Sequence, residues 1–464
     1  MDFRDTTIEE LAGAIRKGER SAEQVMQSTL ANIARQNPAL NAFIAFVDPD
    51  RALEQARAID ARVARGYDPG ALAGVPVGVK DLEDVEGLRT TRGSLLFADA
   101  VPAADDSIAV RRLRAAGAVV VGKTNTPEFG CKGSTDNLLF GATLNPRNTD
   151  YSPGGSSGGS AAALAAGLVP LATGSDGGGS IRIPAAACGF SGFKSSPGVV
   201  PQGGRDAPGP GILGVRGPMA RTLRDTVIAF DVMKGDDATD IFAMPDNRTP
   251  WLPGYDARRL PERVIWAPTL GFAEIDAGVL AVCEAAVAQL RAAGVTVVER
   301  DDVLDEHPMS HWWTMWTASM ARTLGDKVGT ADWERIDPPL RSMVETGLKV
   351  TGTDYARALD ACHRYNYQLE QAFSDAPFIL SPTCAGRTPR SQADGVVNGR
   401  STPAWVEMTF GINMSRNPAA SVHAGLNDDG LPVGLQIIGR QRRDLDTLYA
   451  AGSIERQLGG PGRC

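Results

Sequence analysis

Histidine is scarce in this chain, and its distribution limits the chemistry that the first half can perform. The four histidines are His307, His311, His363 and His423, so the first 306 residues contain none. A serine nucleophile in that region would need a proton acceptor. Lysine is the obvious candidate, which points to acyl transfer without histidine.

Other features that the sequence lacks exclude several classes of protein. The six cysteines form no C-x-x-C pair and have no metal-ligand spacing, which favours free thiols in a reducing compartment. The longest apolar stretch, residues 161–172, is too short to span a membrane, and the N-terminus is too polar for a secretory signal. The formal charge of −8, without a basic block, disfavours nucleic-acid and lipid surfaces. We expect a cytoplasmic enzyme that acts on a small molecule without metal or cofactor, with a homodimer as the candidate assembly.

The order of apolar and helical segments predicts an α/β fold. β-branched runs alternate with alanine-rich helical segments between residues 75 and 200, which is typical of a large central mixed sheet covered on both faces by helices. We expect residues 1–65 to form a helical segment packed on an α/β domain over 66–464. Residues 196–218 read as a loop, and residues 304–372 as a mostly helical region on the substrate side. The predicted helices are 7–18, 21–36, 50–65, 108–116, 160–166, 220–234, 277–293 and 444–458, and the predicted strands are 75–79, 118–121, 169–173, 295–298, 378–380 and 434–438, with a further strand soon after 262.

One lysine directly follows an apolar run: Lys80 comes after VPVGV at residues 75–79. Burial of its stem would lower its pKa from the usual value of about 10.4, because desolvation disfavours the ammonium form. A neutral amine at working pH can act as a general base. The alternative interpretation is a structural ion pair with Asp81 or Asp84.

Two glycine- and serine-rich segments follow, GGSSGGS at residues 154–160 and GSDGGGS at 174–180. Around Ser156 and Ser180, glycines would let backbone N–H groups approach a reacting oxygen closely. The glycines at 177–179 suit an oxyanion hole. The alternative is a flexible linker, but linkers rarely lie between an apolar strand and an alanine-rich helix.

Three other segments match known motifs and offer alternative functional sites. Residues 117–124, GAVVVGKT, fit the Walker A pattern with Lys123, but the intervening residues favour a strand and not a phosphate-binding loop. Residues 154–158 fit the G-x-S-x-G elbow of α/β-hydrolases, with His423 as the available histidine, but a turn-like sequence precedes them where the elbow needs a strand. Residues 191–194 fit S-x-x-K and lack its partner motifs.

All seven tryptophans fall in the second half of the chain, and Trp312, Trp313 and Trp316 are clustered. They serve either to pack a helical layer or to form an aromatic wall for an apolar or aryl substrate.

The two glycine-rich segments resemble the defining stretch of the amidase signature family, through PGGSSGGSA at 153–161 and GGSIRIPA at 178–185. GVPVGVKD at 74–81, GKTNTPEF at 122–129, GPMART at 217–222, NPAAS at 417–421 and GLPVGLQ at 430–436 are similar to family segments too. The resemblance covers roughly residues 65–455. It implies an amidase signature fold and accounts for the Walker-like string as a strand.

The resemblance also implies a role for each residue. Ser180 would be the nucleophile, and Ser156, after a cis peptide bond, would connect it to the base Lys80. The backbone N–H groups of Gly177, Gly178 and Gly179 would hold the oxyanion. The supporting residues would be Ser157, Asp176 and Arg182.

Departures from the family pattern bear on the substrate. Ile183 stands where the glutaminyl/glutamyl-tRNA amidotransferase subunit usually has glutamine, which favours a stand-alone amidase. Gly177 is found in a subset similar to hydrolases of nylon oligomers and aryl amides, and other relatives cleave carbamates. We therefore expect hydrolysis of a linear amide or carbamate. The alternatives are a nucleotide-binding protein that uses Lys123 and a glutamine-hydrolysing amidotransferase subunit.

Overall fold

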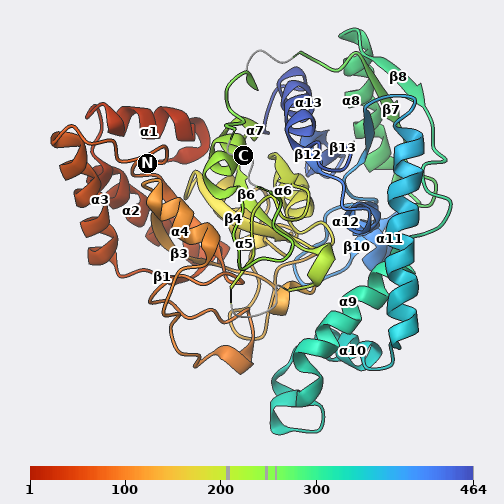
Figure 1. Ribbon diagram of the computed structural model, residues 1–464, viewed down its shortest axis with the longest axis horizontal. Coiled ribbons are helices and arrows are strands. Elements are labelled where there is room, and N and C mark those ends of the chain that lie inside the picture. The colour runs from red at the N-terminus through yellow and green to blue at the C-terminus, as the bar shows by residue number, and fades with distance from the viewer. Residues whose placement is uncertain (205–208, 246–248, 256–258, 463–464) are drawn as a thin grey trace.

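Two mixed β-sheets with helices packed around them form the core (Figure 1). The computed structural model describes residues 1–204, 209–245, 249–255 and 259–462. The first sheet has the strand order β1-β3-β2-β4-β6, and the second has the order β5-β12-β13-β9-β7-β8. Strand β5 packs beside β6, so the two sheets meet there. The predicted class, an α/β fold with mixed sheets flanked by helices, is confirmed.

The strands of the first sheet and their helices come from the first half of the chain. In chain order they are α1 (Ile8–Arg16), α2 (Ala22–Leu40), β1 (Phe43–Phe46), α3 (Pro49–Ala64), β2 (Pro76–Lys80), α4 (Ile108–Ala115), β3 (Val119–Thr124), α5 (Gly158–Ala165), β4 (Leu171–Asp176), α6 (Arg182–Cys188), β5 (Gly192–Lys194), β6 (Val215–Ala220) and α7 (Leu223–Met233).

The second half supplies most of the second sheet. Its elements are β7 (Arg263–Trp266), α8 (Ala277–Ala292), β8 (Thr296–Glu299), α9 (Met309–Leu324), α10 (Pro338–Gly347), α11 (Gly352–Ala372), β9 (Phe378–Pro382), β10 (Gly395–Val397), β11 (Arg400–Thr402), α12 (Phe410–Met414), β12 (Ala419–Leu426), β13 (Pro432–Gly439) and α13 (Asp444–Gln457). Strands β10 and β11 form a separate two-stranded hairpin.

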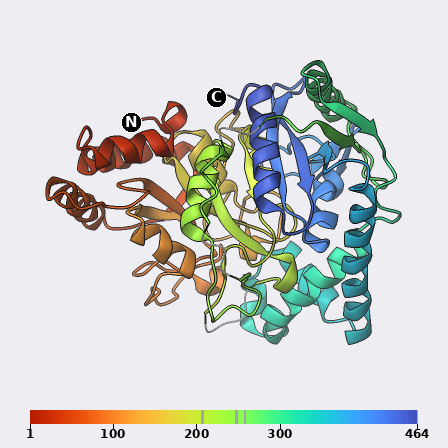
Figure 2. The same cartoon turned by 45° about the horizontal axis from the view of Figure 1, so that its top comes forward.

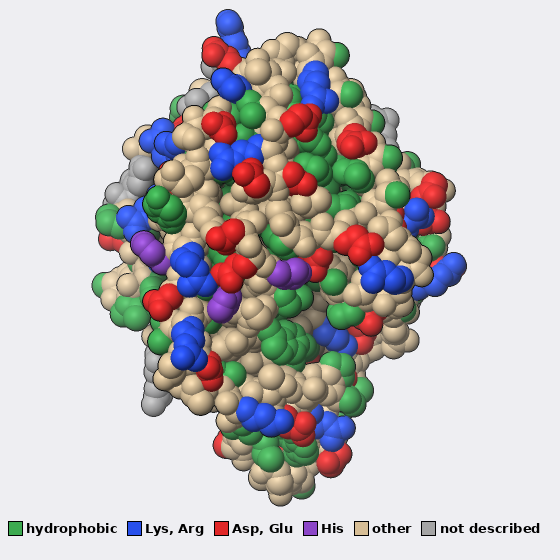
Figure 3. All heavy atoms as spheres, turned by 90° about the vertical axis from the view of Figure 1, so that its right-hand side faces the viewer, with side chains coloured by type: hydrophobic (Ala, Val, Ile, Leu, Met, Phe, Trp, Pro, Cys, Tyr) green, Lys and Arg blue, Asp and Glu red, His purple; other side chains and the backbone are tan. Residues whose placement is uncertain are grey.

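Helices α1–α3 and helices α9–α11 lie at opposite sides of the molecule, as Figures 1 and 2 show. The face that includes α11 carries acidic and basic side chains interspersed, with no field of a single sign (Figure 3). The five cysteines that the structure describes are free, and Cys464 lies outside the described residues. Within the described ranges, no helix has the length and apolar character needed to cross a bilayer.

Six of the strands were not predicted from the sequence: β1, β5, β6, β10, β11 and β12. β1 lies in the segment expected to be helical and pairs antiparallel with β3, so residues 1–65 contribute an edge strand to the first sheet. β6 begins inside the expected loop 196–218, where Gly217 and Pro218 hide the pattern, and pairing with β4 supplies its hydrogen bonds. β12 has one β-branched residue, Val422, and is held between β13 and β5.

Candidate active site

The ends of three parallel strands bring the predicted site together. β2 pairs in parallel with β3 and β4, so their carboxyl ends meet at one edge of the sheet. Lys80 is the last residue of β2, and Asp176 is the last residue of β4. Ligand sites of α/β sheets form at this edge, and both glycine-rich segments lie there.

The Lys80 ammonium group lies among three serine hydroxyls. Its Nζ is 2.7 Å from Ser156 Oγ, 3.0 Å from Ser157 Oγ and 3.0 Å from Ser175 Oγ. The side chain is fully buried. The ion pair with Asp81 that we considered for Lys80 is made by Lys123 instead.

Burial lowers the pKa of Lys80 to about 7, because the ammonium form loses its hydration. The negative charges of Glu83 and Asp176 oppose this shift, and Arg216 reinforces it. The amine is thus poised to exchange a proton near neutral pH, as the sequence predicted for a general base.

Ser156 sits in a tight turn at the start of α5. The peptide bond between Gly155 and Ser156 is cis, as the family resemblance implied. Glycine is required at position 155, because a Cβ atom there would lie 2.4 Å from the Ser134 carbonyl oxygen. The turn therefore holds the Ser156 hydroxyl beside Lys80.

Ser180 lies opposite this turn, after the three glycines, and the residue is 9% exposed. Among the described residues, the N–H groups of Gly177, Gly178 and Ser180 have no acceptor. The N–H of Gly179 differs from the prediction, because it donates to Asp176 Oδ1 over 2.7 Å and is not an open donor. The three open N–H groups can serve a developing oxyanion.

A buried ion pair supports the glycine loop from behind. Arg182 donates to both carboxylate oxygens of Asp176 at 2.9 Å, and both side chains are fully buried. Asn413 donates to Asp176 Oδ1 and accepts from Arg182, at 2.9 and 2.6 Å. Despite burial, which acts in the opposite direction, the Arg182 charge holds the Asp176 pKa well below its usual range. The carboxylate is thus a fixed acceptor for the Gly179 N–H.

Two long-range hydrogen bonds orient the peptide groups of the loop. Trp312 Nε1 donates to the Gly177 carbonyl oxygen at 2.9 Å, and Thr409 Oγ1 donates to the Gly178 carbonyl oxygen at 2.7 Å. Because a carbonyl fixes the peptide plane that it belongs to, these bonds orient the N–H groups of Gly178 and of Gly179. Sequence reasoning found Trp312 as part of an aromatic cluster and missed Thr409 altogether.

A cavity of about 280 Å³ opens next to Ser180. The three clustered tryptophans, Trp312, Trp313 and Trp316, all line it, as the aromatic-wall interpretation requires. Sequence reasoning missed further apolar residues of its lining, among them Met309, Met343, Trp405, Val406 and Phe410. The Trp312 ring stacks on Phe410 with a centroid separation of 4.1 Å and on Trp316 at 5.0 Å.

Trp312 and Trp316 offer a matched pair of variants. Trp316 Nε1 is buried without a hydrogen-bond partner among the described residues, whereas Trp312 Nε1 donates to the Gly177 carbonyl oxygen. We expect Trp312→Phe to lower kcat about fivefold, because a lost hydrogen bond of about 1 kcal/mol loosens the loop. Trp316→Phe should leave kcat nearly unchanged and alter mainly KM. Steady-state kinetics on a chromogenic anilide check this, and equal losses of kcat would contradict the orienting role of Trp312.

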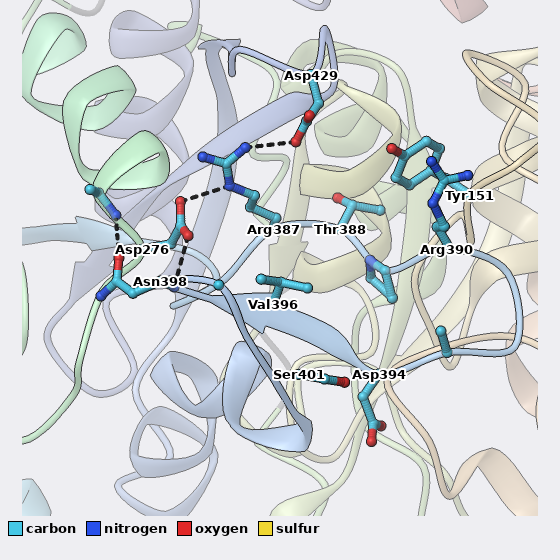
Figure 4. Close-up of a pocket in the computed structure, with 14 residues that line it drawn as sticks. Tyr151, Asp276, Arg387, Thr388, Arg390, Asp394, Val396, Asn398, Ser401 and Asp429 are labelled. Atoms are coloured by element: carbon cyan, nitrogen blue, oxygen red, sulfur yellow. Dashed lines mark hydrogen bonds and ion pairs between the residues drawn. The ribbon is translucent and has the colours of Figure 1, made fainter.

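A second cavity of about 660 Å³ shares Ala393 and Asp394 with the first. Its charged centre is Arg387, which pairs with Asp276 at 3.0 Å and with Asp429 at 2.7 Å (Figure 4). Asp394 lies apart from this cluster, on the side toward Ser401 (Figure 4). The two cavities therefore meet at an exposed carboxylate.

The competing motifs do not form sites. Lys123 is buried within β3, where its Nζ donates to the Glu83 carbonyl at 2.5 Å and to Thr90 at 2.9 Å. The Walker-like residues are thus a strand, and the phosphate-loop interpretation is wrong. His423 lies on β12 beside Arg147 and the C-terminal segment, so the elbow interpretation gains no histidine partner.

The sequence profile of the Amidase family matches residues 24–448. The chain is 36% identical over 471 residues to an acylamidase of Rhodococcus erythropolis, with 96% of this chain and 94% of that protein covered. The chain belongs to the amidase family. The predicted resemblance is confirmed, and this amidase is a hydrolase of amide bonds.

Two further similar proteins represent two different types of amidase. The A-type subunit of a glutamyl-tRNA(Gln) amidotransferase from Chloroflexus aggregans is 34% identical over 480 residues, covering 97% of the amidase and 96% of that protein. The crystal structure of a bacterial aryl acylamidase of the amidase signature family superposes with a TM-score of 0.90 at 29% identity, covering 98% and 96% of the two chains. The amidase thus resembles both a stand-alone hydrolase and an amidotransferase component.

Proposed function

We propose that this amidase cleaves the C–N bond of a linear amide or carbamate through a covalent acyl-enzyme on Ser180. The observation that carries the proposal is the 2.7 Å contact between the buried Lys80 amine and Ser156 Oγ, beside the loop that holds Ser180. A lysine with a pKa of about 7 supplies the base that histidine supplies in other serine hydrolases.

Acylation uses the three side chains in sequence. Neutral Lys80 takes the Ser156 proton while Ser156 takes the Ser180 proton, and Ser180 Oγ bonds to the substrate carbonyl carbon. The resulting oxyanion accepts hydrogen bonds from the N–H groups of Gly177, Gly178 and Ser180. The proton on Lys80 then passes through Ser156 to the leaving nitrogen, the C–N bond breaks, and the ester with Ser180 remains.

Deacylation repeats the relay with water. Water loses a proton to the pair of Ser156 and Lys80 and attacks the ester carbon, and Ser180 recovers its proton as the acid leaves. For a carbamate cleaved at its C–N bond, the acid released is a carbonate half-ester.

The lining of the inner cavity favours an aryl or other apolar substituent. Stacked indole rings beside Ser180 provide flat apolar surface for a ring, and Ile183 adds an aliphatic side chain. The same position usually carries glutamine in the amidotransferase subunit that the chain resembles. We therefore favour a stand-alone amidase over glutamine hydrolysis.

Trapping the intermediate tests the proposal directly. We expect a fast burst of aniline from an activated anilide, together with an acyl group that peptide mass spectrometry places on Ser180. Acyl transfer to another residue, or hydrolysis without a covalent intermediate, would overturn the proposal.

A substrate panel separates the candidate substrates. The proposal expects aryl amides and aryl carbamates to be hydrolysed with a higher kcat/KM than aliphatic amides or glutamine. Preference for glutamine, with ammonia released, would support the amidotransferase alternative instead.

We expect Asp394 to favour the hydrolysis of positively charged substrates. No ion pair involves Asp394 among the described residues, whereas the neighbouring Lys132 is paired with Asp136 and Asp337. We expect Asp394→Asn to lower kcat/KM for an anilide with a cationic substituent about two- to fivefold, because an exposed carboxylate is screened by water. A neutral isosteric anilide is the control, and the difference should shrink at high salt. An equal effect on both anilides would contradict this role.

A further inference from the structure

Glu83, three residues after Lys80 in the chain, carries a buried carboxylate. The Glu83 residue is 1% exposed, and neither of its carboxylate oxygens has a hydrogen-bond partner among the described residues. A buried charge of this kind costs free energy unless an opposite charge compensates it. Its cation is Arg216, whose Nη1 lies 3.8 Å from the carboxylate.

The backbone of Glu83 is fixed at both ends. Its N–H donates to the Lys80 carbonyl at 3.0 Å, so the turn that follows β2 keeps the two residues together. Its own carbonyl accepts from Lys123 Nζ at 2.5 Å. Glu83 thus has little freedom to move away from Lys80.

Arg216 approaches the same place from another strand. On β6 it stands directly opposite Ser175 of β4, and opposite residues of an antiparallel pair project from the same face. The Ser175 hydroxyl contacts Lys80 Nζ at 3.0 Å. The strand pairing therefore brings the Arg216 side chain to the Lys80 side of the sheet.

The other charges around Lys80 are already balanced. Asp176, at the end of β4, is neutralised by Arg182 at 2.9 Å. On β3, Lys123 is paired with Asp81 at 3.1 Å. From α5 and the turn before it, Lys80 meets only serine hydroxyls among the described residues. Besides Asp176, the charges that act on Lys80 are those of Glu83 and Arg216.

We propose that Glu83 and Arg216 are positioning residues for the reaction: as a pair of opposite charges beside Lys80, with the carboxylate buried and the guanidinium partly buried, they balance each other's field at its amine. The inference rests on the proposed function, in which Lys80 is the base. Glu83 favours the ammonium form of Lys80, and Arg216 favours the neutral amine. Burial has the largest effect on the pH at which the base becomes available, and the balance of these two charges adjusts it.

The two partners must then have opposite effects when removed. In Glu83→Gln the ammonium form loses its anion and faces an uncompensated Arg216, so the acid limb of kcat/KM should move about one pH unit lower. In Arg216→Met the limb should move about one unit higher, because Glu83 acts alone. The double variant should return close to the wild-type limb. A merely structural pair would lower activity without moving the limb in opposite directions.

Two assays on the full-length enzyme measure the acid limb of the pH profile. Anilide hydrolysis gives kcat/KM, and the rate of Ser180 labelling by a fluorophosphonate reports the base without amine expulsion. Asp84→Asn is the matched control, because Asp84 is an exposed carboxylate one residue away that is not among the charges acting on Lys80. Its limb should coincide with that of the wild type.

The outcomes separate this inference from the proposed function. If Lys80→Met retains substantial activity with an unchanged limb, Lys80 is not the base and the proposed function fails. If Lys80→Met is inactive but the Glu83 and Arg216 variants keep the wild-type limb or shift it in the same direction, the inference alone fails. Thermal unfolding identifies a variant that does not fold. In that case the direction in which the acid limb shifts in the other single variant tests the inference.

Discussion

Ser180→Ala is expected to lower amide hydrolysis by about 10⁴- to 10⁶-fold, the range seen when a serine hydrolase loses its nucleophile. The open N–H groups of the glycine loop and the aromatic cavity remain in this variant, so substrate binding should persist. Residual turnover then measures what binding and the oxyanion donors achieve without covalent catalysis. Single-turnover kinetics and a substrate-binding assay on the same sample check both parts.

Lys80→Met should cost a comparable factor, and the double variant should be no worse than either single one. Residues that act as one relay lose their common function together, so their effects do not add. The loss should persist at alkaline pH, because raising the pH cannot restore a missing amine. Lys123→Ala is the control: it removes another buried lysine and should retain the chemical step, though it leaves Asp81 without its cation. Near wild-type turnover in Ser180→Ala, with dependence on His423, would revive the elbow interpretation.

The residues of the proposed relay carry local signals in the sequence, and the family resemblance supplied their separate roles. An apolar run ending in Lys80 predicts a buried strand end, and glycines around Ser156 and Ser180 indicate sharp turns where backbone groups come close. Sequence alone also separated the Walker-like strand from a phosphate loop, through its β-branched residues. The local composition of the sequence therefore indicated most of the residues proposed for the reaction.

The residues that support the loop could not be predicted, because their partners are distant in the chain. Thr409 and Asn413 lie more than 200 residues from the peptide groups that they contact, and nothing in their own segment marks them. The same reason hid the role of Phe410 in the cavity. Arg216 lies in a strand that its glycine and proline concealed. Such contacts depend on how the two sheets and α9 pack, which no local pattern specifies.

Arg182→Met is expected to lower the free energy of unfolding by about 3–5 kcal/mol, the cost of leaving a buried carboxylate without its cation. Asp176 would then have only Asn413 and backbone donors, and the glycine loop would lose the fixed acceptor that holds the Gly179 N–H. A large fall in kcat should accompany the loss of stability. Arg357→Met is the control, since Arg357 forms an exposed pair with Asp354, 3.5 Å apart, and its loss should leave the stability nearly unchanged.

The pH dependence of this loss identifies its cause. In the native enzyme the Asp176 pKa is held below its usual value of 3.8, so the ionised pair stabilises the fold above that pH and stops doing so as the pH falls through the lowered pKa. Without Arg182, burial becomes the dominant influence and raises the Asp176 pKa. The variant should therefore regain part of its deficit as the pH falls through the raised pKa and Asp176 takes up a proton. Denaturant unfolding of both proteins between pH 7 and pH 5 measures this, and a deficit that stays constant or grows toward low pH would show that lost packing, and not an unpaired charge, destabilises the variant.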